Sequence, residues 1–276
     1  MSRIRRLKLR LELLQYIMSV APECLPPGLD EKLWTYLVGA SALGQSERDV
    51  GFEFYITHFS NCRGCFDPIL EHAFRRHFPV LDPAYFSSHV LNFCKMSIDY
   101  LNRSTEVQRQ PEMMEEDSLN VDGIEQLWRI ILDANNEILA SDASTYLVNF
   151  YLDSRAVLSK PPGVVEATHF KMVERCIAQL NSAALDITGS EVTDGSPMAL
   201  DSVKDNTFQN NERVFQRSLD LLDQFIKGYK NRSEYNKGFQ EQSQGSGLEM
   251  ITGLPLTIRL RWHGFNYQSP VFRSTF

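Results

Sequence analysis

The stretch from Gly123 to Tyr151 constrains the fold more than any other part of the sequence. Its first half places apolar side chains at i, i+3, i+4 and i+7, the spacing of one helix face: Ile124, Leu127, Trp128 and Ile131. Asn135-Asn136 offers a turn, and Ser141 is the expected cap of a second helix with its own apolar stripe. Two short helices cannot bury such stripes alone. We therefore expect further helices stacked beside this hairpin, as in a helical-repeat array.

Similar helices are predicted on both sides of the hairpin. Residues 3–20 keep a helical apolar spacing through a basic stretch, which favours an ordinary packed helix over a transit peptide or a nuclear-localisation patch. Capping residues mark four further helix starts, at Asp30, Ser46, Asp67 and Asp82. Downstream of the hairpin, one more helix carries an apolar stripe at near-heptad spacing: Phe170, Val173, Ile177, Leu180 and Ala184. The predicted class is mostly α, a HEAT- or armadillo-like solenoid of irregular helix pairs.

Composition divides the chain into segments. Acidic residues around Pro111 indicate a linker. Two further stretches indicate flexible linkers: one is dense in Gly, Ser, Thr, Asp, Asn and Pro, and the other is rich in Gly, Ser, Gln and Asn. The expected order is a helical array at 1–102, an acidic linker at 103–118, a helical hairpin plus helix at 119–186, a flexible linker at 187–210, a helix at 211–230, a flexible linker at 231–253 and a β segment at 254–276.

The β segment is the exception to the helical pattern. Apolar residues from Leu254 to Trp262 alternate strictly with Pro, Thr and Arg, which predicts a strand with one buried face. A lone strand is not stable. It must therefore join a sheet that this chain mostly does not contain.

Charge and cysteine content narrow the function classes. A net charge of −7 argues against a general nucleic-acid binder. The sequence contains no run of 18 apolar residues, so no transmembrane helix is expected. Five cysteines, an odd number in a long chain without a secretory signal, indicate free thiols in a reducing compartment. The expected location is the cytoplasm, the nucleus or both, with proteins rather than nucleic acid or membranes as partners.

Cys62-x-x-Cys65, followed by His72 and His77, raises the question of a zinc site. The cysteine spacing is that of a finger, but only six residues separate the two pairs, fewer than the usual dozen. Five residues apart on an α-helix, the two histidines would diverge by roughly 140°. The alternative is that Cys65 packs as a small hydrophobe at a helix start and that the histidines lie on the surface. We therefore predict no metal ligand and no cofactor.

No catalytic motif is present in the sequence. It lacks a Gly-rich phosphate loop, a Gly-x-Ser-x-Gly elbow and a His-Glu-x-x-His metal motif. Cys94 and Cys176 lie on apolar helix faces, so core packing is expected for both. Trp34 and Trp128 have Leu neighbours at helical spacing and are predicted to anchor the core rather than to bind a ligand.

Six segments, taken in order, carry a family resemblance: Leu25–Phe54, Phe66–Asn102, Gly123–Leu152, His169–Ala183, Arg217–Tyr229 and Gly253–Trp262. Together they resemble the non-catalytic helical region of the large ubiquitin-specific proteases, the fat-facets-like type and its fungal relatives. The resemblance implies that residues 254–276 are the start of a truncated ubiquitin-like domain. It also implies a parent enzyme that removes ubiquitin from proteins by thiol catalysis.

The catalytic residues of that family do not carry over to this chain. Its nucleophile lies in a Gly-x-x-Asn-x-Gly-x-x-Cys type box, and none of the five cysteines has that context: Cys24, Cys62, Cys65, Cys94 and Cys176. The histidine box is absent too, since Trp262-His263-Gly264 does not match it. We expect a non-catalytic scaffold, a fragment upstream of a peptidase domain. The alternatives are a free-standing helical-repeat adaptor unrelated to ubiquitin and a zinc-dependent protein at Cys62–His77.

Overall fold

The computed structural model describes residues 2–20, 26–39, 42, 44–61, 68–108, 121–189 and 201–243. These residues are mostly helical and include no β-strand. The elements are α1 (Arg3–Val20), α2 (Leu29–Leu37), α3 (Gln45–Asn61), α4 (Pro68–His72), the π-helix η2 (Ala73–His77), the 3-10 helices η3 (Phe78–Val80) and η4 (Pro83–Tyr85), α5 (Ser88–Gln108), α6 (Ile124–Asp133), α7 (Glu137–Asp153), α8 (Arg155–Leu158), α9 (Pro162–Gly189) and α10 (Asp201–Ser243). The predicted strand at 254–262 lies outside the described residues.

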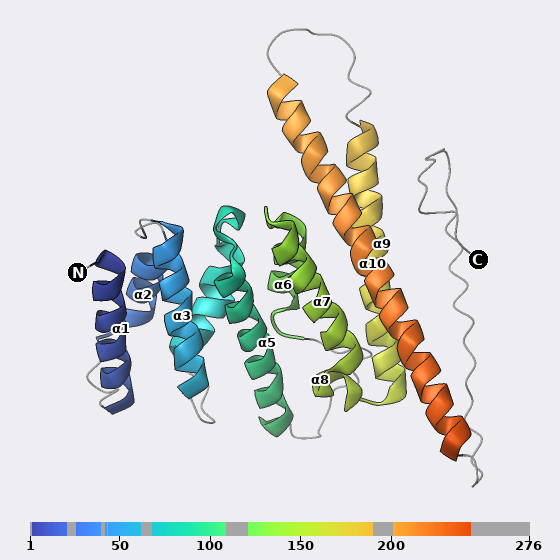
Figure 1. Cartoon of the computed structure of the whole chain (residues 1–276), viewed down its shortest axis with the longest axis horizontal. Helices are drawn as coiled ribbons and strands as arrows, with labels where there is room; N and C mark the ends of the chain where they lie inside the picture. Colours follow the sequence, from blue (N-terminus) through green and yellow to red (C-terminus); the bar gives the residue numbers. More distant parts are fainter. Residues whose placement is uncertain are drawn as a thin grey trace. The chain divides into compact units, whose positions relative to one another are not determined.

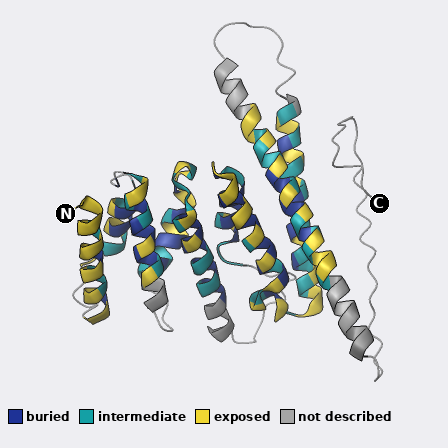
Figure 2. Cartoon of the chain, in the orientation of Figure 1, coloured by how far each residue is buried: buried dark blue, intermediate teal, exposed yellow. Residues whose placement is uncertain are grey.

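Contacts divide the chain into two units, Met1–Arg232 and Ser233–Phe276. Within the first unit, helices pack mainly against their neighbours in chain order: α1 on α3, α2 on α3, α3 on α5, α5 on α6 and α7, and α6 on α7 (Figure 1). A continuous hydrophobic cluster accompanies this order, with members from Leu11 in α1 to Phe225 in α10. Figure 2 shows buried residues (dark blue) along the helices from α2 to α7, whereas α1 is coloured mostly as exposed.

Aromatic rings fill the part of this cluster between α2 and α5. Trp34 meets Phe52 edge to face at 6.0 Å between centroids, and Phe93 lies 5.5 Å from Phe52 and 5.6 Å from Phe78. Such arrangements favour the aromatic quadrupoles in addition to burying apolar area. Trp34 is 6% exposed and Trp128 is 1% exposed, so the prediction that both tryptophans are buried in the core is confirmed.

The central hairpin forms as predicted, but its second helix begins earlier than expected. Gly123 precedes α6 with φ of 90°, a left-handed conformation that glycine adopts without strain. The N-cap of α7 is Asn136, whose side chain accepts hydrogen bonds from the N–H groups of Ile138 and Leu139. The predicted cap at Ser141 is therefore wrong. The turn residue itself satisfies the free N–H groups, and Ser141 lies inside the helix.

Three other predicted helix starts also shift. Ser46 lies inside α3, which begins at Gln45. Asp30 lies inside α2, since the N-cap is Gly28 with φ of 72°. Asp82 accepts a hydrogen bond from the N–H of Ala84 but opens only the short η4. The long helix that was expected to start there begins at Ser88.

The predicted linkers are partly helical. Helix α5 continues to Gln108, α9 continues to Gly189, and α10 includes residues 201–210 and 231–243. The linker predictions are wrong for these residues, while 109–120, 190–200 and 244–253 lie outside the described residues. Once packing has nucleated a helix, each added residue gains one hydrogen bond, so polar flanks can continue it.

Helices α9 and α10 pack against the hairpin through polar as well as apolar contacts. Arg217 of α10 is 5% exposed and donates to the carbonyl oxygens of Ile131 at 3.1 Å and Leu132 at 2.9 Å. These carbonyls belong to the last turn of α6, where helical partners are missing. The predicted stripe of α9 is wrong at Phe170, which is 59% exposed, because the helix buries Met172 and Cys176 instead.

Candidate metal centre

A π-helical turn brings together two histidines that the sequence separates. In η2 the N–H of Phe78 donates to the carbonyl oxygen of Ala73, five residues back. Hydrogen bonds that span five residues align residues i and i+5 on one face, unlike those of an α-helix. The rings of His72 and His77 accordingly stack at 5.0 Å between centroids, with 6° between their planes. The prediction that these side chains diverge is wrong for this reason.

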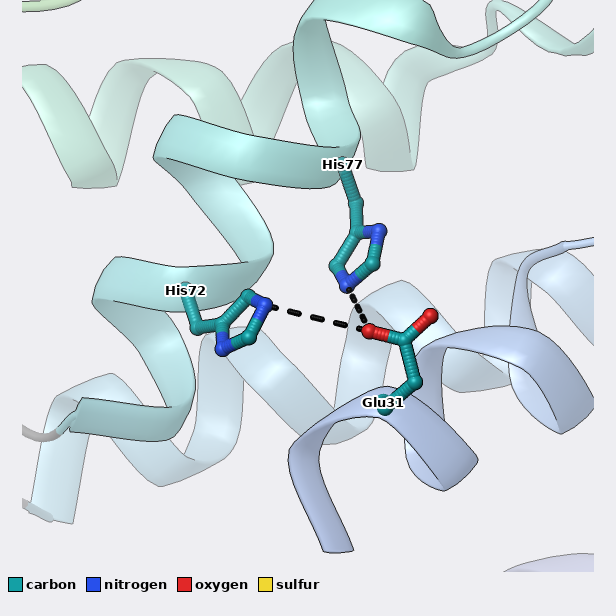
Figure 3. A group of neighbouring side chains, drawn as sticks. All are labelled: Glu31, His72 and His77. Carbon is teal, nitrogen blue, oxygen red and sulfur yellow. Dashed lines mark ion pairs between the residues drawn. The ribbon is translucent and has the colours of Figure 1, made fainter. Parts of the chain in front are cut away.

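Glu31 of α2 faces both histidines (Figure 3). Its Oε2 lies 3.1 Å from Nε2 of His77 and 3.8 Å from Nε2 of His72. One potential ligand atom from each of the three residues lies within 4.8 Å of the other two. The arrangement therefore gathers two imidazole nitrogens and one carboxylate oxygen around a common point.

Asp30 holds His72 from the other side of the ring. Its Oδ2 contacts Nδ1 of His72. Because an ionised carboxylate only accepts hydrogen bonds, Nδ1 carries the proton and Nε2 keeps its lone pair in the neutral ring. Nη1 of Arg76 lies 3.5 Å from that Nε2, which places a positive charge beside the cluster on an exposed side chain.

His77 is the more buried histidine of the pair. Its side chain is 13% exposed, against 25% for His72, and Trp34 stacks on its other face at 5.3 Å and 15°. Its Nε2 is buried and makes no aligned hydrogen bond within the described part of the chain, although Glu31 lies at ion-pair distance. Burial lowers the pKa of His77, opposed by Glu31 and reinforced by His72.

The sequence pointed to the two histidines but not to Glu31. Glu31 lies in another helix, and no local spacing links it to His72 or His77. The two cysteines with finger spacing, Cys62 and Cys65, lie outside the described residues. Chemically, the described trio can hold a divalent cation or share protons between its imidazoles and carboxylate.

The two cysteines within the described residues are packing residues. Cys94 and Cys176 are both fully buried and free, as predicted. Burial raises the pKa of both thiols, that of Cys176 to about 12. A thiol in this state carries almost no thiolate at neutral pH and is a poor nucleophile.

A surface pocket of about 380 Å³ lies beside Trp128, but its charges already have partners. Arg175 pairs with Glu125 and lies 4.5 Å above the Trp128 ring. Arg129 donates to the carbonyl oxygens of Pro79 at 2.6 Å and Leu81 at 2.5 Å. The arginines thus tie α6 to the preceding segment and to α9 and are not free to bind a ligand.

No family model matches the chain, and none of the curated proteins matches it either. Among the described residues, no helix has both the length and the apolar character needed to cross a bilayer.

Proposed function

We propose that this chain is a non-catalytic scaffold that binds other proteins, built as a HEAT- or armadillo-like solenoid. One observation carries the proposal: the helices of Met1–Arg232 pack mostly on their neighbours in chain order. That contact pattern is typical of stacked helical repeats, which present extended surfaces to partners. The non-catalytic role draws support from the two described thiols, which are buried and have raised pKa values.

The proposed setting is a large deubiquitinase of the fat-facets-like type. The support is the ordered resemblance of six segments, from Leu25 to Trp262. In this setting the helices position a catalytic domain elsewhere in the parent protein, and residues 254–276 begin its ubiquitin-like domain. The partners are ubiquitin-pathway substrates or adaptors, in the cytoplasm, the nucleus or both.

The non-catalytic role is tested with a fluorogenic ubiquitin substrate. We expect no cleavage by the purified chain with a reducing agent present, while a ubiquitin-specific protease catalytic domain cleaves the substrate under the same conditions. Cleavage that a thiol-blocking reagent abolishes would overturn the scaffold proposal. The coding sequence downstream tests the family: a peptidase cysteine box supports the deubiquitinase, and a genuine stop supports a free-standing adaptor.

The solenoid is tested by hydrogen exchange on a locally destabilised variant. Leu11 is 7% exposed and packs α1 into the cluster. In a stacked array, Leu11→Ala should speed amide exchange in α1 and α3 and leave α6 and α7 protected, because each unit contacts only its neighbours. Leu147→Ala in α7 is the matched variant and should give the reverse pattern. Equal acceleration in all helices by both variants would contradict the solenoid.

A further inference from the structure

We propose that Glu31, His72 and His77 bind one zinc ion, with Asp30 orienting His72. The site joins α2 to the α4–η2 segment, which are in contact without it. It is independent of the scaffold proposal, since it rests on side-chain geometry alone. It also differs from a cysteine-histidine finger, because a carboxylate from a distant helix replaces the cysteines.

Two of the three distances between ligand atoms lie close to those of tetrahedral zinc, and the third is no longer than 4.8 Å. Bonds of about 2.0–2.2 Å to nitrogen and oxygen place neighbouring ligand atoms about 3.3–3.5 Å apart. Oε2 of Glu31 lies 3.1 Å from Nε2 of His77, slightly less than this range, and 3.8 Å from Nε2 of His72, slightly more (Figure 3). Small rotations of the Glu31 side chain, which is 56% exposed, can equalise the two distances. A water molecule completes the fourth position.

The surroundings prepare the nitrogens for a metal. Asp30 on Nδ1 of His72 forms the carboxylate–histidine pair that commonly fixes the tautomer and orientation of a metal-ligating imidazole. Nε2 of His77 is buried without an aligned hydrogen bond from the described residues, so no existing bond must break there. Trp34 stacks on the His77 ring at 5.3 Å between centroids and limits its rotation.

Charge and donor type favour zinc over harder cations. The carboxylates of Glu31 and Asp30 together balance the charge of a divalent ion. Imidazole nitrogen suits zinc, whereas magnesium and calcium prefer oxygen ligands only. Arg76 opposes binding, because its guanidinium lies 3.5 Å from Nε2 of His72. Its exposed side chain is free to turn into solvent when the ion enters.

The experiment uses the untagged full chain, stripped with a chelator and titrated with zinc against a chromophoric competitor. We expect one zinc per chain, a higher Tm with zinc than without it, and a tetrahedral absorption spectrum when cobalt replaces zinc. Glu31→Gln, His72→Gln and His77→Gln should each weaken binding by more than about 100-fold, and Asp30→Asn by about 10–100-fold. His89→Gln is the matched control, since His89 also lies beside an acid, Asp49, at 3.5 Å.

Three results would overturn the site. One is a zinc content near zero with no change in Tm. Another is equal weakening by His89→Gln and by the ligand variants, which would mean non-specific binding. The third is binding that survives Glu31→Gln but is lost in a Cys62→Ser/Cys65→Ser double variant, which would assign the metal to the cysteines. Because Glu31 is exposed, its variant keeps the core and reports on the metal even if a histidine variant fails to fold.

Discussion

His72 and His77 stack in parallel at 5.0 Å because the chain between them forms a π-helical turn rather than an α-helical one. π-Turns are rare and are often found at functional sites. On an α-helix, side chains five residues apart point in different directions. In this π-turn they lie on the same face, and the two rings stack. The sequence of Ala73–His77 does not predict the π-turn, because its residues are compatible with an α-helix.

Trp128 tests the packing of the central hairpin. Its ring is 1% exposed and lies under Arg175. Trp128→Ala should lower the free energy of unfolding by about 3–5 kcal/mol, because it removes a large buried side chain and leaves a cavity. Urea unfolding measures the loss. Tyr36→Ala is the control, since Tyr36 is 68% exposed and should change stability by no more than about 0.5 kcal/mol. A loss below 1 kcal/mol at Trp128 would mean that the hairpin core is misassigned.

Arg217 tests the attachment of α10 to the hairpin. It donates to the terminal carbonyls of α6 and also to Glu137, at 2.6 Å from Nη2. Arg217→Met should cost about 2–3 kcal/mol, because buried carbonyl oxygens lose charged donors.

Glu137→Gln separates the ion pair from those carbonyl bonds. The Glu137 side chain is 71% exposed, so this variant should cost less than about 1 kcal/mol. Denaturant melts compare the two variants. Equal losses would show that the Arg217–Glu137 ion pair, and not the carbonyl bonds, holds the helix.

His169 gives stability a pH dependence. Its Nε2 lies 2.9 Å from the carbonyl oxygen of Tyr151. Burial lowers the pKa of His169; the hydrogen bond to Tyr151 and the charge of Glu166 oppose this shift, and the charge of Arg232 adds to it. With the folded pKa below the unfolded value of about 6.5, the unfolded chain takes up the proton first as pH falls. The His169 contribution is therefore absent well above pH 6.5 and becomes destabilising below it.

His169→Gln should make the free energy of unfolding fall less between pH 7.5 and pH 5.5 than it does in the unmodified chain. Urea melts at both values measure this. Phe170→Gln on the same helix removes no titrating group and should leave the fall unchanged. An unaltered fall in His169→Gln would contradict the assigned shift.

A substitution at Gly123 tests how closely the start of α6 approaches Ile98 and Phe74. Its φ is 90°, and an added Cβ would lie 2.7 Å from Cγ1 of Ile98 and 2.8 Å from Cζ of Phe74. Gly123→Ala should cost about 2–4 kcal/mol, from the left-handed backbone and the steric overlap together. Gly28→Ala has a similar φ of 72° but open space around its Cβ, so it should cost only about 1–2 kcal/mol. Thermal or denaturant melts measure both losses. A larger loss of stability for Gly28→Ala than for Gly123→Ala would contradict the steric overlap at Gly123.

The helical class, the buried tryptophans and the buried Cys94 and Cys176 followed from the sequence by itself. Apolar periodicity is a local property of the sequence, and two apolar helix faces can be buried against each other in few ways. The pattern around Trp128 therefore determined the central hairpin. Helix ends were predicted less well. Asn136, not Ser141, caps the second helix of the hairpin. The polar ends of α10 are helical because adding residues to a helix is favourable once packing has formed its first turns.

Only the tertiary structure decided how distant residues meet. Glu31 reaches His72 and His77 because α2 packs on α4 and η2, and Arg217 reaches the end of α6 because α10 packs on the hairpin. These contacts join residues that no periodicity relates. The sequence determined which faces are apolar, and the packing of those faces decided which polar groups lie within bonding distance.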